Sequence, residues 1–154
     1  TIELMLERGT VLVPTLSTLL RELPASATPE RRAQRAVLQE RGLDSVRRAI
    51  AAGVPVVVGT DAGVHPHGRN LRELGLLVEA GLDPLAAIRA GTLGGAELLG
   101  LETSIGSVEA GKLADLVVSD AHPLGGIGRL ADDGAVRMVV QSGRVLVDLD
   151  RRVG

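Results

Sequence analysis

The side chains that could do chemistry in this sequence are three histidines, Asp61 and a few arginines, and Asp61 has the most suggestive position. It lies in the glycine-flanked segment 59–63, directly after the apolar segment 54–58. In parallel α/β folds, ligands and catalytic groups gather at the carboxyl ends of strands. A carboxylate there can bind a divalent metal or accept a proton from metal-bound water. An Asx-turn that ends the strand is the alternative, and position alone leaves both interpretations open.

Two of the histidines follow Asp61 in the same loop. His65-Pro66-His67 has the spacing of a metal-binding His-x-His pair. Because the proline and the surrounding glycines impose no periodicity on the loop, nothing in the spacing forces both rings to one side. A solvated loop, or a histidine that bonds to backbone, is therefore the alternative. The third histidine, His122, precedes a proline in a predicted turn, and we expect it at the surface.

Composition excludes several classes of protein. The 154-residue chain has a net charge of −2 and contains neither aromatic residues nor cysteine. The absence of cysteine removes disulfides, Cys-ligated zinc and thiol catalysis, and it fits the cytoplasm, where we expect the protein. A near-neutral charge without rings to stack on bases argues against nucleic acid. The longest apolar run is far shorter than the ~20 residues needed to span a bilayer, which argues against a membrane protein.

The segments around these residues predict alternating strands and helices. Segment 10–13 is a short apolar strand, and 54–58 is rich in β-branched residues without alternation, as in a parallel strand buried on both faces. Between them, residues 28–29 have the N-cap and first-turn types of a helix that ends near Gly53. Gly42 marks a point where this helix could kink. Its inward side chains are expected to be Ala33, Val37, Leu38, Val46 and Ile50.

Three shorter helices are predicted next. The first begins at Asn70, which would form a capping-box pair with Glu73, and ends at Gly81. Residues 83–84, Asp-Pro, have the N-cap and first-position types that begin the second helix. Thr92 begins the third.

Beyond residue 101 the sequence becomes β-like. Apolar segments 136–141 and 144–147 flank the two-residue turn at 142–143, a pattern that indicates a β-hairpin. Asp115 lies in this tail, where a structural role at a turn or strand end is expected. The order of elements predicts an α/β protein with an all-β tail.

Four stretches of the chain contain longer motifs, namely 4–17, 59–74, 105–118 and 139–147. Together they resemble the amidohydrolase superfamily, and most closely its imidazolonepropionase-like and Xaa-Pro dipeptidase-like branch. The resemblance implies an α/β fold in which residues 1–101 form the C-terminal part of a (β/α)8 TIM-like barrel, about its last two strands and helices. Residues 102–154 would then be the C-terminal strands of a small composite β-sandwich domain.

The resemblance also implies roles for individual residues. Asp61 matches the aspartate that ends the eighth barrel strand, where it helps to hold the metal and shuttles a proton from the attacking water to the leaving amine. The implied cofactor is a divalent metal, zinc being expected, as one or two ions. His67 matches a His-Gly of this branch and would contact substrate or order the loop. His65 has no such match and is a second candidate for substrate binding.

Several metal ligands of the family have no counterpart in this sequence: the His-x-His of the first strand, a bridging lysine, and the histidines of the fifth and sixth strands. Lys112, the only lysine, lies in the β-domain motif and cannot replace the bridging one. The sequence also starts at Thr1 inside a predicted helix. We therefore expect a C-terminal fragment that does not catalyse alone. Its expected partners are the missing N-terminal part of the same protein and further copies of itself in a homo-oligomer.

Three functions compete at this stage. The first is part of a metal-dependent hydrolase that cleaves a C–N bond in a small amide, cyclic amide or dipeptide. The second is a non-catalytic structural or interaction remnant that keeps Asp61 only for its turn. The third, a small phosphate- or nucleotide-binding domain, is weakened because the sequence has neither a Walker loop nor a dinucleotide fingerprint. Neither nucleic acid nor membrane is an expected partner.

A first prediction concerns the isolated chain. Two parallel strands without further neighbours would leave unpaired edges, so the 154-residue chain alone should melt broadly or associate. Circular dichroism during heating and size-exclusion chromatography measure this directly. A sharp cooperative melt of an isolated monomer would contradict the expectation.

Overall fold

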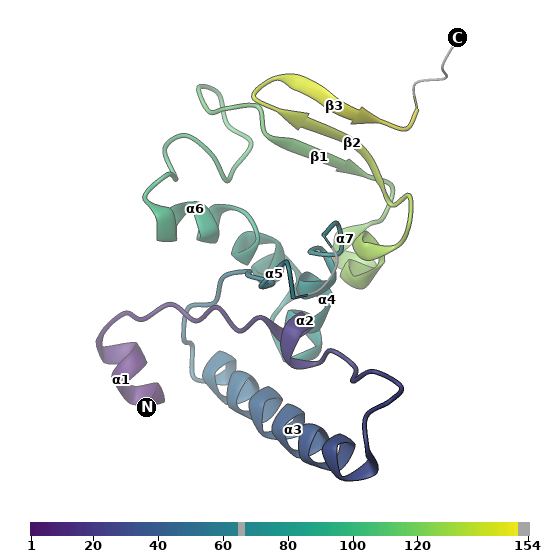
Figure 1. Cartoon of the computed structure of the whole chain (residues 1–154). Coiled ribbons are helices and arrows are strands. Elements are labelled where there is room, and N and C mark those ends of the chain that lie inside the picture. The colour runs from purple at the N-terminus through teal and green to yellow at the C-terminus, as the bar shows by residue number, and fades with distance from the viewer. Residues whose placement is uncertain (65–66, 151–154) are drawn as a thin grey trace.

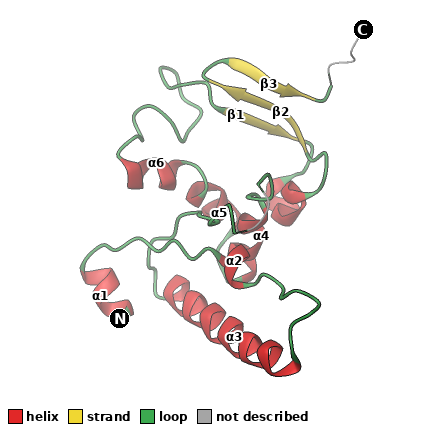
Figure 2. Cartoon of the chain, viewed as in Figure 1, coloured by secondary structure: helices red, strands yellow, loops and turns green. Residues whose placement is uncertain are grey.

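A helical part and a small sheet make up the computed structural model, which describes residues 1–64 and 67–150 (Figure 1). The chain begins in the helical part, and the sheet lies at the opposite side of the molecule from α3 (Figure 2). In the described ranges, no helix has the length and apolar character that crossing a membrane requires.

Two segments run in parallel through the helical part, but they form a single β-bridge rather than two strands. The bridge joins Leu12 to Val56. The Leu12 N–H donates to the Pro55 carbonyl (2.8 Å), and the Val57 N–H donates to the Leu12 carbonyl (3.0 Å). The prediction of full strands at 10–13 and 54–58 was therefore wrong in extent, although the parallel pairing is present.

Two prolines and the lack of a further pairing strand among the described residues explain why the pairing is so short. Pro14 ends the first segment, and Pro55 has no N–H to donate to a ladder. On the far side of the second segment, the Val58 N–H donates to the carbonyl of Ala90 (3.0 Å), the last residue of a helix. Each pairing thus ends after one or two hydrogen bonds.

The long helix α3 (Pro29–Ala51) begins as its sequence predicts. Thr28 is the N-cap, and its hydroxyl accepts from the Arg31 N–H. Its C-terminal half is packed, with Val46 and Ala49 buried. Its N-terminal half is not, because Val37 and Leu38 are 46% and 59% exposed.

Two expectations about α3 were therefore wrong. Ala33, Val37 and Leu38 are exposed rather than inward, because the single-turn helix α2 (Leu16–Leu19) contacts only a short stretch of the much longer α3. The helix is also continuous through Gly42, where an added Cβ would lie 2.8 Å from a methyl of Leu19. Close packing explains this glycine without a kink.

Several of the helices share one apolar core. The predicted cap of α5 (Pro84–Ala90) is confirmed, since the Asp83 carboxylate accepts from the N–H groups of Leu85 and Ala86. The buried core combines residues from several helices: Leu16, Val46, Leu74, Leu76, Leu77, Ala80, Ala87 and Ile127. The other helices are α1 (Ile2–Glu7), α4 (Arg72–Glu79), α6 (Leu93–Leu99), α7 (Pro123–Gly126) and the 3₁₀ helix η1 (Ile127–Ala131).

The C-terminal sheet has the order β1-β2-β3 and is antiparallel throughout. Its strands are β1 (Leu116–Ser119), β2 (Val136–Gln141) and β3 (Arg144–Asp148). The hairpin is confirmed: Ser142 and Gly143 both have positive φ (50° and 78°), as a type I′ turn requires. Asp115 has the expected structural role, because its carboxylate accepts from the Ser142 N–H (2.7 Å).

A second prediction tests how closely the two parallel segments approach. A Cβ added at Gly59 would lie 2.4 Å from Cγ1 of Val13, so Gly59→Ala should lower the free energy of unfolding by about 1–3 kcal/mol through overpacking. Adding Val13→Ala should recover most of this loss, because it removes the clashing methyl. Urea unfolding of the intact protein, the two single variants and the double variant measures this double-mutant cycle. If the losses in free energy of unfolding were additive in the double variant, the close approach of Gly59 to Val13 would be contradicted.

Candidate functional site

Asp61 lies on an exposed loop just beyond the carboxyl end of the bridged segment. Its φ of 53° places it in the left-handed region, which Asp and Asn adopt more readily than most residues. The Val64 N–H donates to the Asp61 carbonyl (3.1 Å) and closes a turn. The backbone is therefore fixed by the turn, while the residue remains exposed to solvent.

The neighbouring segment ends in the same unusual way. Thr15, which follows the segment that contains Leu12, has a φ of 47°. For a β-branched residue this is a strained conformation. A Cβ placed on Gly59 would lie 3.8 Å from Cγ2 of Thr15, so the two segment ends are close. Strain of this kind is concentrated at functional sites when the surrounding structure enforces it.

The structure enforces the Thr15 conformation through Glu73, which is fully buried. The Leu16 N–H donates to Oε1 of Glu73 (2.6 Å) and the Ser17 N–H donates to Oε2 (2.8 Å). These are the first two amides of α2, which have no partner within the helix. A carboxylate from α4 thus caps a helix 56–57 positions away along the chain.

The predicted capping box between Asn70 and Glu73 was wrong. Helix α4 begins at Arg72 with Leu71 as N-cap and no side-chain cap bond. Both oxygens of Glu73 are engaged by α2 instead.

The sequence did contain a signal for this burial. At helical spacing, Glu73 shares a face with Leu76, Leu77 and Ala80, all of which are buried. An acidic residue on an apolar face predicts a buried polar partner, because an unpaired buried charge is costly.

The other end of α2 is held by α3. Arg35 donates through Nη2 to the carbonyls of Thr18 (3.0 Å) and Leu19 (2.7 Å). Gln39 donates to the carbonyls of Leu19 and Arg21 (3.2 Å each). An anion at the N-terminus and a cation at the C-terminus both match the helix dipole.

Helix α2 in turn contacts the Asp61 loop. The Thr18 hydroxyl donates to the carbonyl of Thr60 (3.1 Å), the residue before Asp61. Arg21 reaches the carbonyl of Val64 at 3.4 Å. Thr60 and Val64, the two ends of segment 60–64, therefore each accept a hydrogen bond from a side chain in or just after α2.

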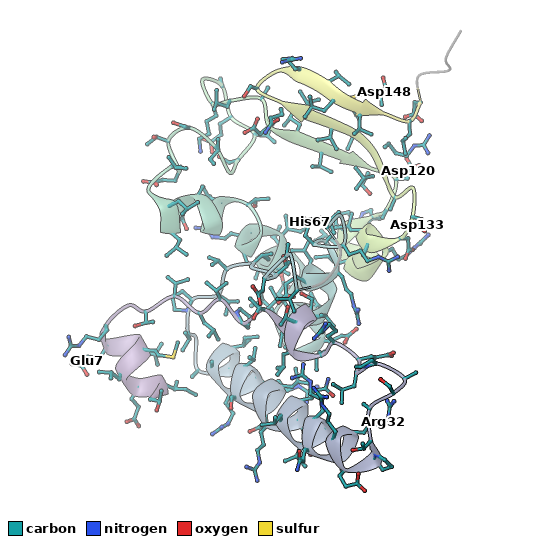
Figure 3. All side chains as sticks on the ribbon, viewed as in Figure 1. Glu7, Arg32, His67, Asp120, Asp133 and Asp148 are labelled. Carbon is teal, nitrogen blue, oxygen red and sulfur yellow. The ribbon has the colours of Figure 1, made fainter. Side chains whose placement is uncertain are left out.

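Neither His67 nor His122, the two histidines that the structure describes, belongs with Asp61 to a group of three side chains that could hold a metal ion. His67 is exposed and, in the view of Figure 3, lies at the edge of the helical part that faces the sheet. His65 lies outside the described residues. His122 is exposed at the start of α7, as predicted.

Lys112 is occupied elsewhere. Its Nζ donates to the Ser107 hydroxyl and lies 3.4 Å from the Glu109 carboxylate. The bond from Ser107, and then the charge of Lys112, hold the pKa of Glu109 below its usual value. The lysine therefore stabilises the turn before β1.

Residues 1–64 and 67–150 contain no group of three or more His, Asp or Glu side chains placed to hold a metal ion. A zinc site in a protein takes at least three protein ligands. Asp61 fits one such position, because an exposed carboxylate offers the oxygen that a divalent cation binds. The described part of the chain does not complete the site.

A groove of about 600 Å³ between α1 and α3 lies away from this region. Its lining comes from α1, Leu12 and the C-terminal half of α3, and no residue of the Asp61 loop contributes.

Similarity to known proteins identifies the family of the chain, which the geometry of the site does not. Residues 1–146 match the group described as "Amidohydrolase family". The chain is 33% identical over 107 residues to the imidazolonepropionase of Symbiobacterium thermophilum, an alignment that covers 66% of this chain and 25% of that protein. It is 37% identical over 89 residues to a 5-methylthioadenosine/S-adenosylhomocysteine deaminase of Moorella thermoacetica, covering 51% and 21%.

Solved structures are similar over nearly the whole chain. A Xaa-Pro dipeptidase with bound methionine matches with a TM-score of 0.81 and 34% identity, covering 95% of this chain and 36% of that one. The ochratoxinase of A. niger matches with a TM-score of 0.79 and 30% identity, covering 96% and 34%. The chain thus spans between a fifth and about a third of the lengths of these relatives.

A third prediction concerns the backbone at Asp61. Asn tolerates the left-handed region as Asp does, so Asp61→Asn should change the free energy of unfolding by less than about 0.5 kcal/mol. Asp61→Val should cost about 1–2 kcal/mol, because a β-branched residue is strained there. Urea unfolding of both variants in the intact protein checks the contrast, and equal stabilities would show that the turn relaxes.

Proposed function

The chain belongs to the amidohydrolase family, and from this premise we propose that the intact protein is a metal-dependent hydrolase of carbon–nitrogen bonds to which this chain contributes Asp61. The observation that carries the proposal is the position of Asp61. It follows the end of a parallel segment, beside a second segment end, where barrel enzymes place catalytic groups.

We assign residues 1–101 to the last two strands and helices of a (β/α)8 barrel and residues 102–154 to the closing strands of a small β-domain. The parallel pairing of Leu12 with Val56 supports the first assignment, and the separate antiparallel sheet supports the second. Such a barrel takes about 250 residues. The fraction of the relatives that the chain covers agrees with a partial barrel.

In the proposed reaction, Asp61 acts through its carboxylate. An Oδ atom accepts a proton from the attacking water and passes it to the nitrogen of the departing amine, so that the C–N bond breaks without expelling an unprotonated amine. A bound divalent ion, for which we expect zinc, supplies a lowered water pKa. Asp61 would be one of its ligands, and the remaining ligands would lie outside this chain.

The substrate class is a small amide, cyclic amide or dipeptide. Support comes from the similarity to an imidazolonepropionase and to a Xaa-Pro dipeptidase. His67 is exposed on the same loop as Asp61 and is proposed to contact substrate, and His65 is its second candidate. A small-molecule substrate also agrees with the near-neutral net charge of −2.

The competing proposal is a structural or interaction remnant without catalysis. Its support is that the described residues supply no cluster of three ligands. The two proposals differ in what the protein does with Asp61, and that difference is measurable.

A fourth prediction separates them. In the intact protein, Asp61→Asn should keep the fold but lower kcat for an amide or dipeptide substrate by about 10²–10⁴, because proton transfer is lost. Activity is measured on N-acyl amino acids, Xaa-Pro dipeptides and small cyclic amides, with circular dichroism as the folding control. Wild-type protein that hydrolyses none of these, or an Asp61→Asn variant with full activity, would favour the remnant.

A further inference from the structure

We infer that Glu73 is a positioning residue that fixes the Asp61 loop through helix α2. The consequence for catalysis rests on the function proposed above, whereas the mechanical coupling does not. The coupling consists of three links, from Glu73 to the start of α2, through α2 itself, and from α2 to the residue that precedes Asp61.

The first link is strong because it is buried and charge-assisted. Glu73 is 0% exposed, and each of its oxygens accepts one amide, at 2.6 and 2.8 Å. Hydrogen bonds to an ionised acceptor are about twice as strong as neutral ones. A leucine would fill the same apolar face but would leave two buried N–H groups without this partner.

The second link is the rigidity that the caps give to α2. A helix of four residues has no stability of its own in water. Its position is set by Glu73 at one end and by Arg35 and Gln39 at the other. The strained Thr15 immediately precedes the capped amides. Loss of the Glu73 bonds therefore frees Thr15 to relax and α2 to shift.

The third link passes the position of α2 to the loop. The Thr18 hydroxyl bonds to the Thr60 carbonyl, and Arg21 bonds to the Val64 carbonyl. Thr60 and Val64 flank Asp61, whose carbonyl accepts from the Val64 N–H. A displacement of α2 thus moves Thr18 directly, and it moves Arg21 because Arg21 follows the C-cap Leu20 of α2.

The experiment compares three variants of the intact protein. Glu73→Gln keeps the size of the side chain but cannot accept both amides, since its NH₂ group faces one N–H. Thr18→Val removes only the bond to Thr60. Glu79→Gln changes an exposed carboxylate on the same helix and serves as the matched control. Hydrogen–deuterium exchange is measured for peptides that cover residues 15–21 and 59–64, and kcat and KM are measured in parallel.

Glu73→Gln should accelerate exchange in both peptides and lower kcat about tenfold or more, with a smaller change in KM, because misplacement of a catalytic group acts on the chemical step. Thr18→Val should accelerate exchange in 59–64 alone. Glu79→Gln should change neither. If 59–64 exchanges normally in both Glu73→Gln and Thr18→Val, the inference is wrong and Glu73 acts only on α2.

The two proposals fail in distinguishable ways. Absence of hydrolysis in the wild-type protein overturns the proposed function but leaves the exchange pattern as an independent result. Normal exchange of 59–64 in an active enzyme overturns only the coupling. If Glu73→Gln does not fold, Thr18→Val still decides the third link, because it leaves the buried carboxylate intact.

Discussion

A single buried carboxylate joins two helices that lie more than fifty positions apart in the chain. Glu73 belongs to α4, yet both of its oxygens bind amides of α2. In a low-dielectric interior this arrangement is stable only when the charge is fully engaged, because an unpaired buried carboxylate is too costly. The strained turn at Thr15, the packing of Leu16 in the core and the contact with the Asp61 loop all follow from where this carboxylate holds α2.

The elements that sequence predicts correctly are those decided by neighbours in the chain. Thr28 and Asp83 cap the helices that follow them, and Ser142-Gly143 makes its turn, because each acts within three residues. The burial of Val37 and Leu38 was mispredicted. Helical periodicity predicts an apolar stripe along α3, but it does not predict how much of that stripe the short helix α2 covers. The length of the strand at 54–58 was overestimated for a similar reason. A β-branched composition favours extended backbone, but it does not show how many neighbouring strands are present to pair with it.

At the candidate site, the sequence proposes Asp61 as the functional residue but does not show what holds its loop. Asp61 was recognisable from its place after an apolar segment and from family resemblance. Glu73 was predicted to pair with Asn70, three positions away, in a local capping box, whereas the amides that it binds are more than fifty positions away. No local rule predicts which distant amides a carboxylate will meet. The one signal in the sequence for the burial of Glu73 was the helical face that it shares with Leu76 and Leu77.

The separation of these contacts along the chain has a consequence for folding kinetics. The β2–β3 hairpin closes through residues that are adjacent across a two-residue turn, whereas the Glu73 bonds close a loop of 56–57 positions. Loop closure over the longer distance costs more entropy, and contacts of low sequence separation form sooner. We expect the hairpin to form early and α2 to dock late, an order that pulse-labelled exchange would reveal as protection of the Val139 amide before that of Leu16. The region around Asp61 would then be among the last parts of the chain to become ordered.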